Sequence, residues 1–184
     1  MTTWIIIGII AVLIIAAIAV YNNLVRCRKE VDNSWAQIDV QLKRRCDLIP
    51  NLVETVKGYA AHESGVLDNV TRARSAAMSP NLSTANRIEA ESKLTGALQG
   101  LMVQVEAYPE LKANQNFLAL QEELASTENR ISFARQHYND TATNYNTAIA
   151  VFPACIFASI FNFKDAELWQ ITDAADREVP KVKF

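Results

Sequence analysis

The chain has few of the residues that interrupt helices or stabilise small extracellular domains. Its 184 residues include only five glycines, five prolines and three cysteines. So few glycines and prolines leave little room for turns, which favours a mostly helical chain. Cys27, Cys46 and Cys155 are odd in number, widely separated and form no CxxC pair. This pattern is typical of a reducing compartment and argues against a disulfide framework.

The inventory of chemically reactive motifs is equally small. Of the two histidines, His62 begins an HExxH-like run, but Val66 stands where the second zinc ligand would be. His137 has no Glu three residues before it, and the glycines form neither GxGxxG nor a P-loop. The sequence therefore predicts a protein that is not an enzyme, without catalytic, cofactor-binding or metal-binding residues. A metal-dependent enzyme is the less favoured alternative.

Charge is nearly balanced, with a formal net charge of −2. Residues 26–60 carry seven Lys or Arg and five Asp or Glu, which gives +2 there and −4 elsewhere. A nucleic-acid-binding protein would show a basic face, so nucleic acid is not expected as a partner. Lys43, Arg44, Arg45, Asp47 and Asn51 form a polar flank that is either solvated or a recognition patch. Glu123 and Glu128 are expected to be exposed to solvent.

Residues 1–25 contain no charged side chain, and an apolar run extends from Trp4 to Tyr21. As a helix this run would be about 27 Å long, close to the thickness of a bilayer's hydrocarbon core. Trp4 and Tyr21 stand where interfacial aromatic residues would, and Arg26, Arg28 and Lys29 follow. A cleaved signal peptide would carry its positive charge before the apolar run.

The sequence therefore predicts a permanent membrane anchor in residues 1–25. Cations beside a span stay on the cytoplasmic side, so we expect the N-terminus outside and the domain in the cytoplasm. The basic cluster is expected to touch anionic headgroups of the lipid bilayer.

An apolar stripe at helical spacing continues beyond the anchor. Its members are Leu24, Cys27, Val31, Trp35, Ile38, Leu42, Cys46, Ile49, Val53, Val56 and Ala60. The stripe keeps its phase across Pro50, which favours one long helix kinked at Pro50 and Asn51. The alternative is a break, with Asp47 capping a new helix that has Pro50 in its first turn. Asn51 is a candidate to bond a carbonyl freed by the kink.

Further helices follow the same pattern. One is expected from about Val66 to Ala77, one capped by Ser83 or Thr84 and ended by Pro109, and a long one from Phe117 to Ile149. The fold class is thus all-α: an N-terminal transmembrane helix continuing into a long-helix antiparallel bundle of three to four helices. Strand evidence is limited to a weak alternation in residues 177–184. We divide the chain into an anchor (1–25), a cytoplasmic helical bundle (26–151) and a terminal segment with an apolar short helix and tail (152–184).

The terminal segment begins with FPACIFASIFNF, residues 152–163, which is more apolar than a small helix needs. The candidate interaction residues are Phe152, Ile156, Phe157, Ile160 and Phe161. Three fates fit this segment: burial in the bundle, contact with a partner or another subunit, and contact with the membrane surface.

Three runs resemble the LemA family of bacterial membrane proteins: WAQIDVQLKRRCDLIPNLVETVKGYAAHE (35–63), YPELKANQNFLALQEELASTENRISFARQHYND (108–140) and YNTAIAVFP (145–153). Together with the N-terminal span they cover most of the chain. After Phe152-Pro153 this chain has ACIFASIF where the family often has a Ser-Asn pair. The resemblance implies a cytoplasm-facing helical domain in a bacterial inner membrane and no established enzymatic activity. The family includes a magnetosome-membrane protein, and other members look associated with membrane peptidases.

The predicted function is therefore a non-catalytic, single-pass membrane protein whose coiled-coil-like bundle forms a homo-oligomer or scaffolds a membrane protein partner. The alternative is an adaptor or regulator of a membrane-bound enzyme such as a peptidase.

Overall fold

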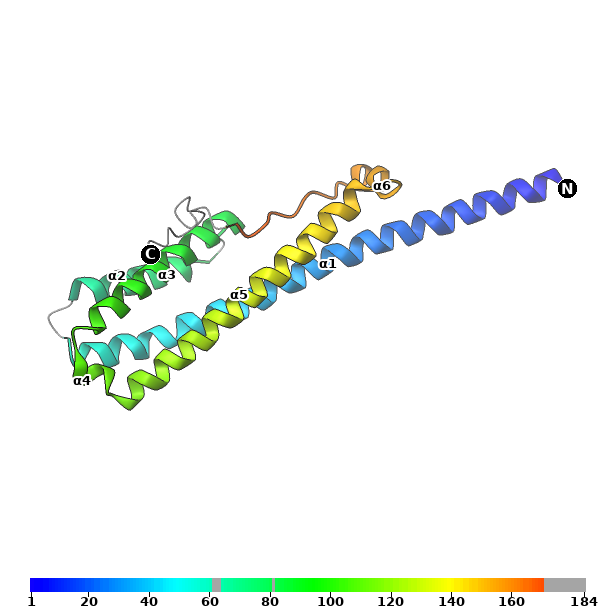
Figure 1. Ribbon diagram of the computed structural model, residues 1–184. Helices are drawn as coiled ribbons and strands as arrows, with labels where there is room; N and C mark the ends of the chain where they lie inside the picture. The colour runs from blue at the N-terminus through cyan, green and yellow to red at the C-terminus, as the bar shows by residue number, and fades with distance from the viewer. Residues whose placement is uncertain (61–63, 81, 171–184) are drawn as a thin grey trace, which may run out of the picture. The chain divides into compact units, whose positions relative to one another are not determined.

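The structure is a computed structural model that describes residues 1–60, 64–80 and 82–170. Every regular element in these ranges is helical, which confirms the all-α prediction (Figure 1). The elements are α1 (Thr2–Lys57), α2 (Ser64–Ala77), α3 (Thr84–Val105), α4 (Pro109–Lys112), α5 (Gln115–Ala150) and α6 (Ala154–Ile160). The weak alternation at residues 177–184 and His62 lie outside the described residues.

The chain divides into two compact units. Unit 1 combines residues 1–39 with 133–168, and unit 2 combines residues 40–132 with Trp169 and Gln170. Each unit takes one part of α1 and one part of α5.

Helix α1 passes through Pro50 without interruption. Proline has no N–H, so the carbonyl of Cys46, four residues earlier, loses its helical donor. The Nε–H of Arg74 on α2 donates to this carbonyl instead, at 2.7 Å. The alternative of a break with Asp47 as N-cap is wrong. Asn51 does not have the role expected of it: its side chain is exposed, and the freed carbonyl is bonded from another helix.

Unit 2 is a bundle of four helical segments around an apolar core. Residues 40–57 of α1 and 115–132 of α5 pack with α2 and α3, and the short α4 lies at one end (Figure 1). The stripe predicted from the sequence forms this core, which contains Cys46, Ile49, Leu52, Val56, Leu67, Val70, Leu94, Leu101, Leu111 and Phe117 among its buried side chains. Leu52 is fully buried although the predicted stripe passed through Val53.

The helix ends of unit 2 follow local capping chemistry. Ser83 is the N-cap of α3, as predicted, and its hydroxyl accepts from the backbone N–H of Asn86 at 3.3 Å. Asn114 begins α5: its Oδ1 accepts from the N–H groups of Asn116 at 2.9 Å and Phe117 at 3.1 Å. Between α3 and α5, Pro109 opens the single helical turn α4.

In unit 1, residues 133–150 of α5 run antiparallel to α1 (Figure 1). The buried Ser34 hydroxyl lies 2.8 Å from the Thr141 hydroxyl, and the rings of Trp35 and Tyr138 meet edge to face at 5.1 Å. Trp35 was expected on the core stripe, but it is only half-buried. Because the aromatic pair is formed across the two helices, it still contributes to the α1–α5 contact.

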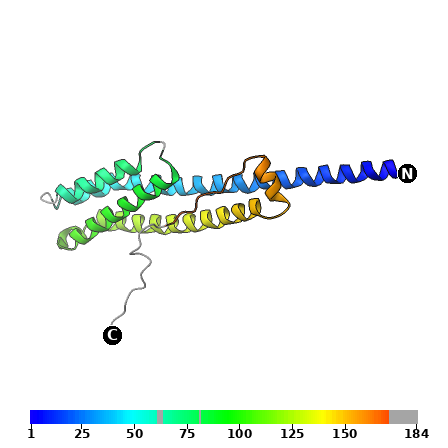
Figure 2. The ribbon, with the colours of Figure 1, turned by 90° about the horizontal axis from the view of Figure 1, so that it is seen from above.

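The chain reverses after α6 through a Schellman motif. Asn162 has a positive φ of 55°, the N–H of Phe163 donates to the carbonyl of Ala158 at 2.9 Å, and the N–H of Asn162 donates to that of Ser159 at 3.4 Å. Asparagine is among the residues that best tolerate this left-handed conformation. The reversal sends residues 163–168, which we call the strap, back along α5 (Figure 2).

Candidate functional site

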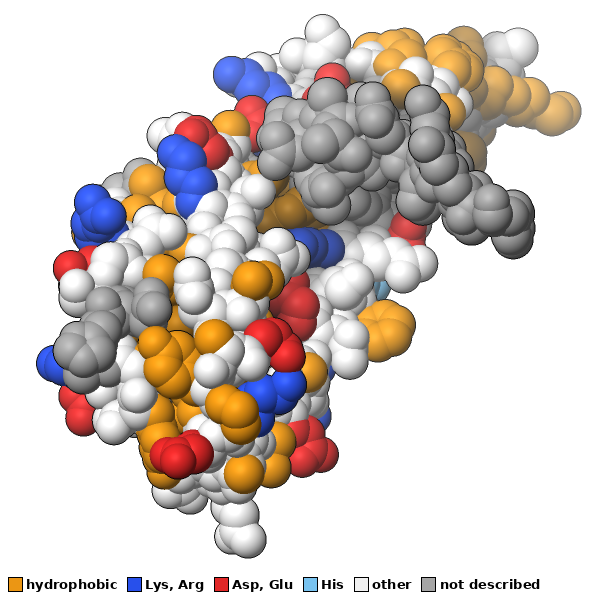
Figure 3. Space-filling view, turned by 60° about the vertical axis from the view of Figure 1, so that its left-hand side comes forward, with side chains coloured by type: hydrophobic (Ala, Val, Ile, Leu, Met, Phe, Trp, Pro, Cys, Tyr) orange, Lys and Arg blue, Asp and Glu red, His pale blue; other side chains and the backbone are white. Residues whose placement is uncertain are grey.

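The N-terminal part of α1 carries one stretch long and apolar enough to cross a bilayer, with a mean hydropathy of 3.0 and none of its residues buried. Its hydrophobic side chains appear at the upper right of Figure 3. At its two ends, Trp4 is 78% exposed and Tyr21 is 37% exposed. Arg26, Arg28 and Lys29 follow on the same helix, are all exposed, and Lys29 pairs with Asp32 at 3.0 Å.

The residues around α6 form a second apolar surface in unit 1. Phe152, Ile156, Ile160 and Phe161 are 79%, 51%, 69% and 54% exposed. Phe157 is half-buried. Of the three fates considered for this segment, burial in the bundle is therefore wrong for four of its five candidate residues.

This surface adjoins the end of the apolar stretch of α1. The ring of Tyr21 lies 4.8 Å from that of Phe161 and 6.1 Å from that of Phe163, in tilted and edge-to-face arrangements. The structure thus brings one of the predicted anchor residues together with one of the predicted interaction residues, which sequence patterns alone did not connect.

The strap is held on α5 by side chains that donate to its backbone. Asn146 binds Ala166 twice, with Nδ2 donating to the carbonyl at 2.9 Å and Oδ1 accepting from the N–H at 2.8 Å. The hydroxyl of Tyr145 donates to the carbonyl of Lys164 at 2.9 Å, and that of Tyr138 to the carbonyl of Glu167 at 2.6 Å. Sequence reasoning missed this role, although these three side chains lie in the runs that resemble the LemA family.

Both tyrosines have raised pKa values. Burial is the main cause for Tyr138, and the Glu167 carboxylate raises its pKa further. Burial also raises the pKa of Tyr145, with Arg28 acting in the opposite direction and Asp165 and Asp32 in the same one. The two hydroxyls therefore stay protonated and able to donate to the strap up to unusually high pH.

A polar hollow of about 600 Å³ lies between α1, α5 and the strap in unit 1. Arg28 and Lys164 face Asp32 and Asp165 around it, with Tyr145 on its wall. Cations and anions are equal in number in this lining, so the hollow has no preference for ligands of one charge.

Unit 2 contains a buried ion pair that sequence reasoning did not find. The guanidinium of Arg45 is 1% exposed and pairs with the equally buried carboxylate of Glu91 on α3. It also donates to Glu128 on α5 at 2.6 Å and to the Thr95 hydroxyl at 3.0 Å. Arg45 had been assigned to the polar flank and Glu128 to solvent. The sequence contained one indication that Glu91 is buried: it lies three residues before Leu94 and therefore on the apolar face of its helix.

Arg44, the neighbour of Arg45, has the character expected of a solvated flank. It pairs with Glu123 at 2.7 Å, and both side chains are more than 40% exposed. Lys43, Asp47 and Asn51 are exposed.

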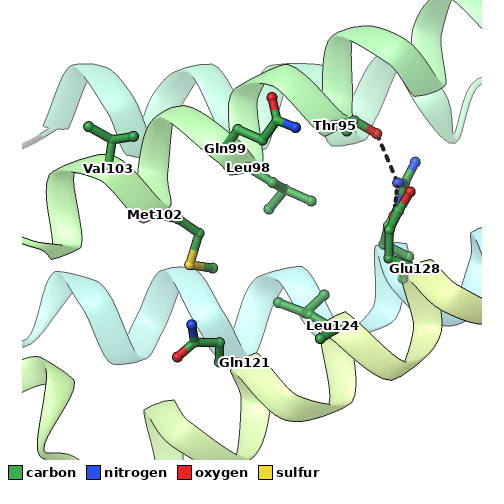
Figure 4. A pocket seen from close by; sticks show the side chains of 10 residues that line it. Thr95, Leu98, Gln99, Met102, Val103, Gln121, Leu124 and Glu128 are labelled. Atoms are coloured by element: carbon green, nitrogen blue, oxygen red, sulfur yellow. Dashed lines mark hydrogen bonds and ion pairs between the residues drawn. The ribbon is translucent and has the colours of Figure 1, made fainter. Parts of the chain in front are cut away.

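An apolar groove of about 470 Å³ separates α3 from α5 in unit 2. Leu98 and Met102 from α3 point toward Leu124 on α5 (Figure 4). Gln99 and Gln121 lie at its sides and Glu128 lies at one end (Figure 4). Arg45, which donates to Glu128, also lines the groove. We call this the α3–α5 groove. It offers hydrophobic contact with a few hydrogen-bonding groups at its margins.

No group of three or more His, Cys, Asp or Glu that could hold a metal occurs among residues 1–60, 64–80 and 82–170. His137 is exposed on α5. Burial is the main cause that raises the pKa of the Cys46 thiol, with Glu91 adding to it, so this thiol is protonated and unreactive.

The fold and these surfaces define a class of protein: an all-α chain whose first helix begins with a candidate membrane span and whose water-facing parts are paired helices. The sequence model of the LemA family matches residues 34–184. The chain belongs to the LemA family, as its three characteristic runs predicted.

Named relatives agree with this assignment. The chain is 26% identical over 152 residues to Protein LemA of Metamycoplasma hominis, covering 83% of this chain and 69% of that protein. It is 26% identical over 184 residues to magnetosome proteins MamQ 1 and MamQ 2 of Paramagnetospirillum magneticum, covering 86% of this chain and 68% of each of those proteins. None of these relatives is named as an enzyme. The family, the relatives and the apolar N-terminal helix together indicate a membrane-associated protein.

Proposed function

We propose that the chain is a non-catalytic, single-pass membrane protein that assembles with itself or with membrane protein partners through the α3–α5 groove. The groove itself is the observation that carries this function. Val103 on its edge is 71% exposed, while Leu98 and Met102 are only partly covered, so two neighbouring helices leave apolar surface open between them.

Such a groove suits an amphipathic helix better than a small substrate. A helix lays side chains spaced three and four residues apart into an apolar channel, and the groove's glutamines can bond to polar groups at its margins. The LemA relationship supports a membrane setting for this assembly. The cations Arg26, Arg28 and Lys29 after the span support an N-terminus outside and a bundle in the cytoplasm of a bacterial cell.

Photocrosslinking tests the groove directly. A photoreactive side chain at Val103, irradiated in native membranes, should give an adduct of twice the chain mass for self-assembly, or a defined heterologous adduct for a membrane partner. Phe133, which is 72% exposed on α5 in unit 1, is the matched control position. A heterologous adduct containing a membrane-bound enzyme would identify the adaptor form of this function.

A charge placed in the groove provides the second half of the test. Gln99 is exposed, and Gln99→Glu keeps the shape of its side chain while adding a negative charge. The variant should therefore reduce the Val103 adduct without unfolding the bundle. If Val103 gives no more adduct than Phe133, and the detergent-solubilised particle has the mass of one chain, the proposed assembly is wrong.

A further inference from the structure

The surface around α6 is built from part of the longest uncharged run of sequence after the first helix. Residues 151–163 contain no Lys, Arg, Asp or Glu. Four of their large apolar side chains, those of Phe152, Ile156, Ile160 and Phe161, are at least half exposed. A contiguous apolar surface of this kind marks a site that binds a membrane or another protein, and no other part of unit 1 buries these four side chains.

The position of α6 beside the apolar stretch of α1 indicates that the membrane contacts this surface. Tyr21 ends the apolar run of α1, where an aromatic side chain lies at the bilayer–water interface. Phe161 and Phe163 contact the Tyr21 ring directly, at 4.8 and 6.1 Å. Whatever depth Tyr21 takes in the bilayer, α6 lies beside it, so its exposed side chains meet the same interface.

Charge supports the same occupant. Arg26 and Arg28 lie one to two turns after Tyr21 on α1, and Lys164 lies four residues after the end of α6. Arg28 and Lys164 share their hollow with Asp32 and Asp165, and Arg26 is exposed outside that lining. Cations at this level face the anionic headgroups while the apolar side chains reach the acyl boundary, which is how interfacial helices bind. The Schellman turn at Asn162 and the bonds of the strap to Asn146 and Tyr145 hold α6 in this place.

We propose that α6 and the turn before it form a second membrane contact, in which Phe152, Ile156, Ile160 and Phe161 enter the headgroup region of the bilayer that α1 crosses. This inference rests on the membrane anchoring of the proposed function and adds to it. The contact fixes how the water-facing helices leave the membrane, because α1 is then held at two levels instead of one.

Spin labelling of the full chain in phosphatidylcholine–phosphatidylglycerol vesicles tests this contact. Nitroxides are attached at Ile156→Cys and at Ile160→Cys, with Cys27 and Cys155 replaced by serine and Cys46 left in the core. The chain without an added cysteine gives the background. Ile10→Cys in the span and Phe133→Cys on α5 serve as lipid and water references. Phe133 lies 17 residues before Ala150, about 25 Å along the helix.

The expected result is several-fold lower collision with a water-soluble nickel complex at Ile156 and Ile160 than at Phe133, together with higher collision with oxygen. A second copy of the chain covering α6 would lower both collision rates and broaden the spectra until unlabelled chain is added, which would overturn the proposal. High nickel access at both positions would overturn it as well.

The Ile10 reference separates this failure from a failure of anchoring. If Ile10 is oxygen-rich and nickel-poor while Ile156 and Ile160 behave like Phe133, the chain is anchored and only the α6 contact is wrong. If Ile10 is also accessible to nickel, the anchor itself is wrong.

Discussion

The buried pair of Arg45 and Glu91 gives the sharpest prediction. Arg45→Met removes the guanidinium but keeps a long flexible side chain in its place. Glu91 then loses this guanidinium as a partner, and both side chains are only 1% exposed in the intact protein. Thr95 keeps a bond, since its hydroxyl also donates to the carbonyl of Glu91 at 3.1 Å.

The size of the effect follows from burial. Removing one partner of a buried ion pair destabilises a protein by about 3–5 kcal/mol, because the other charge loses that partner in a medium of low polarity. Arg44→Met is the matched control, one residue away on the same helix. Its pair with Glu123 is 48% and 42% exposed, and exposed pairs contribute about 0–1 kcal/mol.

Urea denaturation of the full chain in detergent, followed by far-ultraviolet circular dichroism, measures both free energies of unfolding. Detergent covers the apolar N-terminal stretch of α1, so the transition reports the remaining helices. Arg45→Met should lose at least about 2 kcal/mol more than Arg44→Met. The double variant Arg45→Met, Glu91→Met should recover much of that loss, because neither charge is left in the core. Equal losses for the two single variants would refute the reasoning.

Three further outcomes are expected. Arg74→Gln should destabilise unit 2 by about 1–3 kcal/mol in the same denaturation assay, because the carbonyl that Pro50 leaves without a donor loses its bond. Pro50→Ala should suppress this loss by restoring a helical N–H, and an unsuppressed loss would show that Arg74 acts otherwise. Trp35→Ala should cost about 1–3 kcal/mol, below the value for a fully buried tryptophan, and a loss above about 4 kcal/mol would contradict its half-burial. Tyr138 and Tyr145 have raised pKa values, so their contribution to stability is present below the ordinary tyrosine pKa of about 10 and is lost as pH rises through the higher folded-state values. Ultraviolet titration of the intact chain and of the double variant Tyr138→Phe, Tyr145→Phe gives the ionisation of these two hydroxyls by difference. A difference curve with its midpoint at or below about pH 10 would contradict the prediction.

Local patterns predicted much of this fold. The apolar stripe of α1 holds a mean period of 3.6 across a proline, and the structure shows an unbroken helix there. Ser83 predicted the start of α3 because its hydroxyl can cap a helix, and Pro109 predicted that α3 ends before it. These features were predictable because the interactions that specify them lie within four residues of sequence.

The features that were missed depend on distant partners. Arg45 and Glu91 are 46 residues apart, and nothing near either residue indicates which charge will face it in the core. The strap has no periodicity of its own, and it is bound by backbone atoms to side chains 19 to 29 residues earlier. The exposure of α6 was left open for the same reason, since only the folded chain shows that Phe161 lies against Tyr21.

Two adjacent residues of α1 bond the run around Pro50 to the other helices of unit 2. The side chain of Arg45 bonds α3 and α5, and the next residue, Cys46, accepts from Arg74 on α2 through the carbonyl that Pro50 frees. Apolar side chains alone would allow helices to slide by a turn at little cost, whereas buried polar groups lose their bonds in any other register. We therefore infer that this turn sets the register of all four helices of unit 2. The double variant Arg45→Met, Glu91→Met should then recover much of the stability lost by Arg45→Met, but show faster and more heterogeneous hydrogen exchange in α3. Unchanged exchange would mean that the apolar core sets the register by itself.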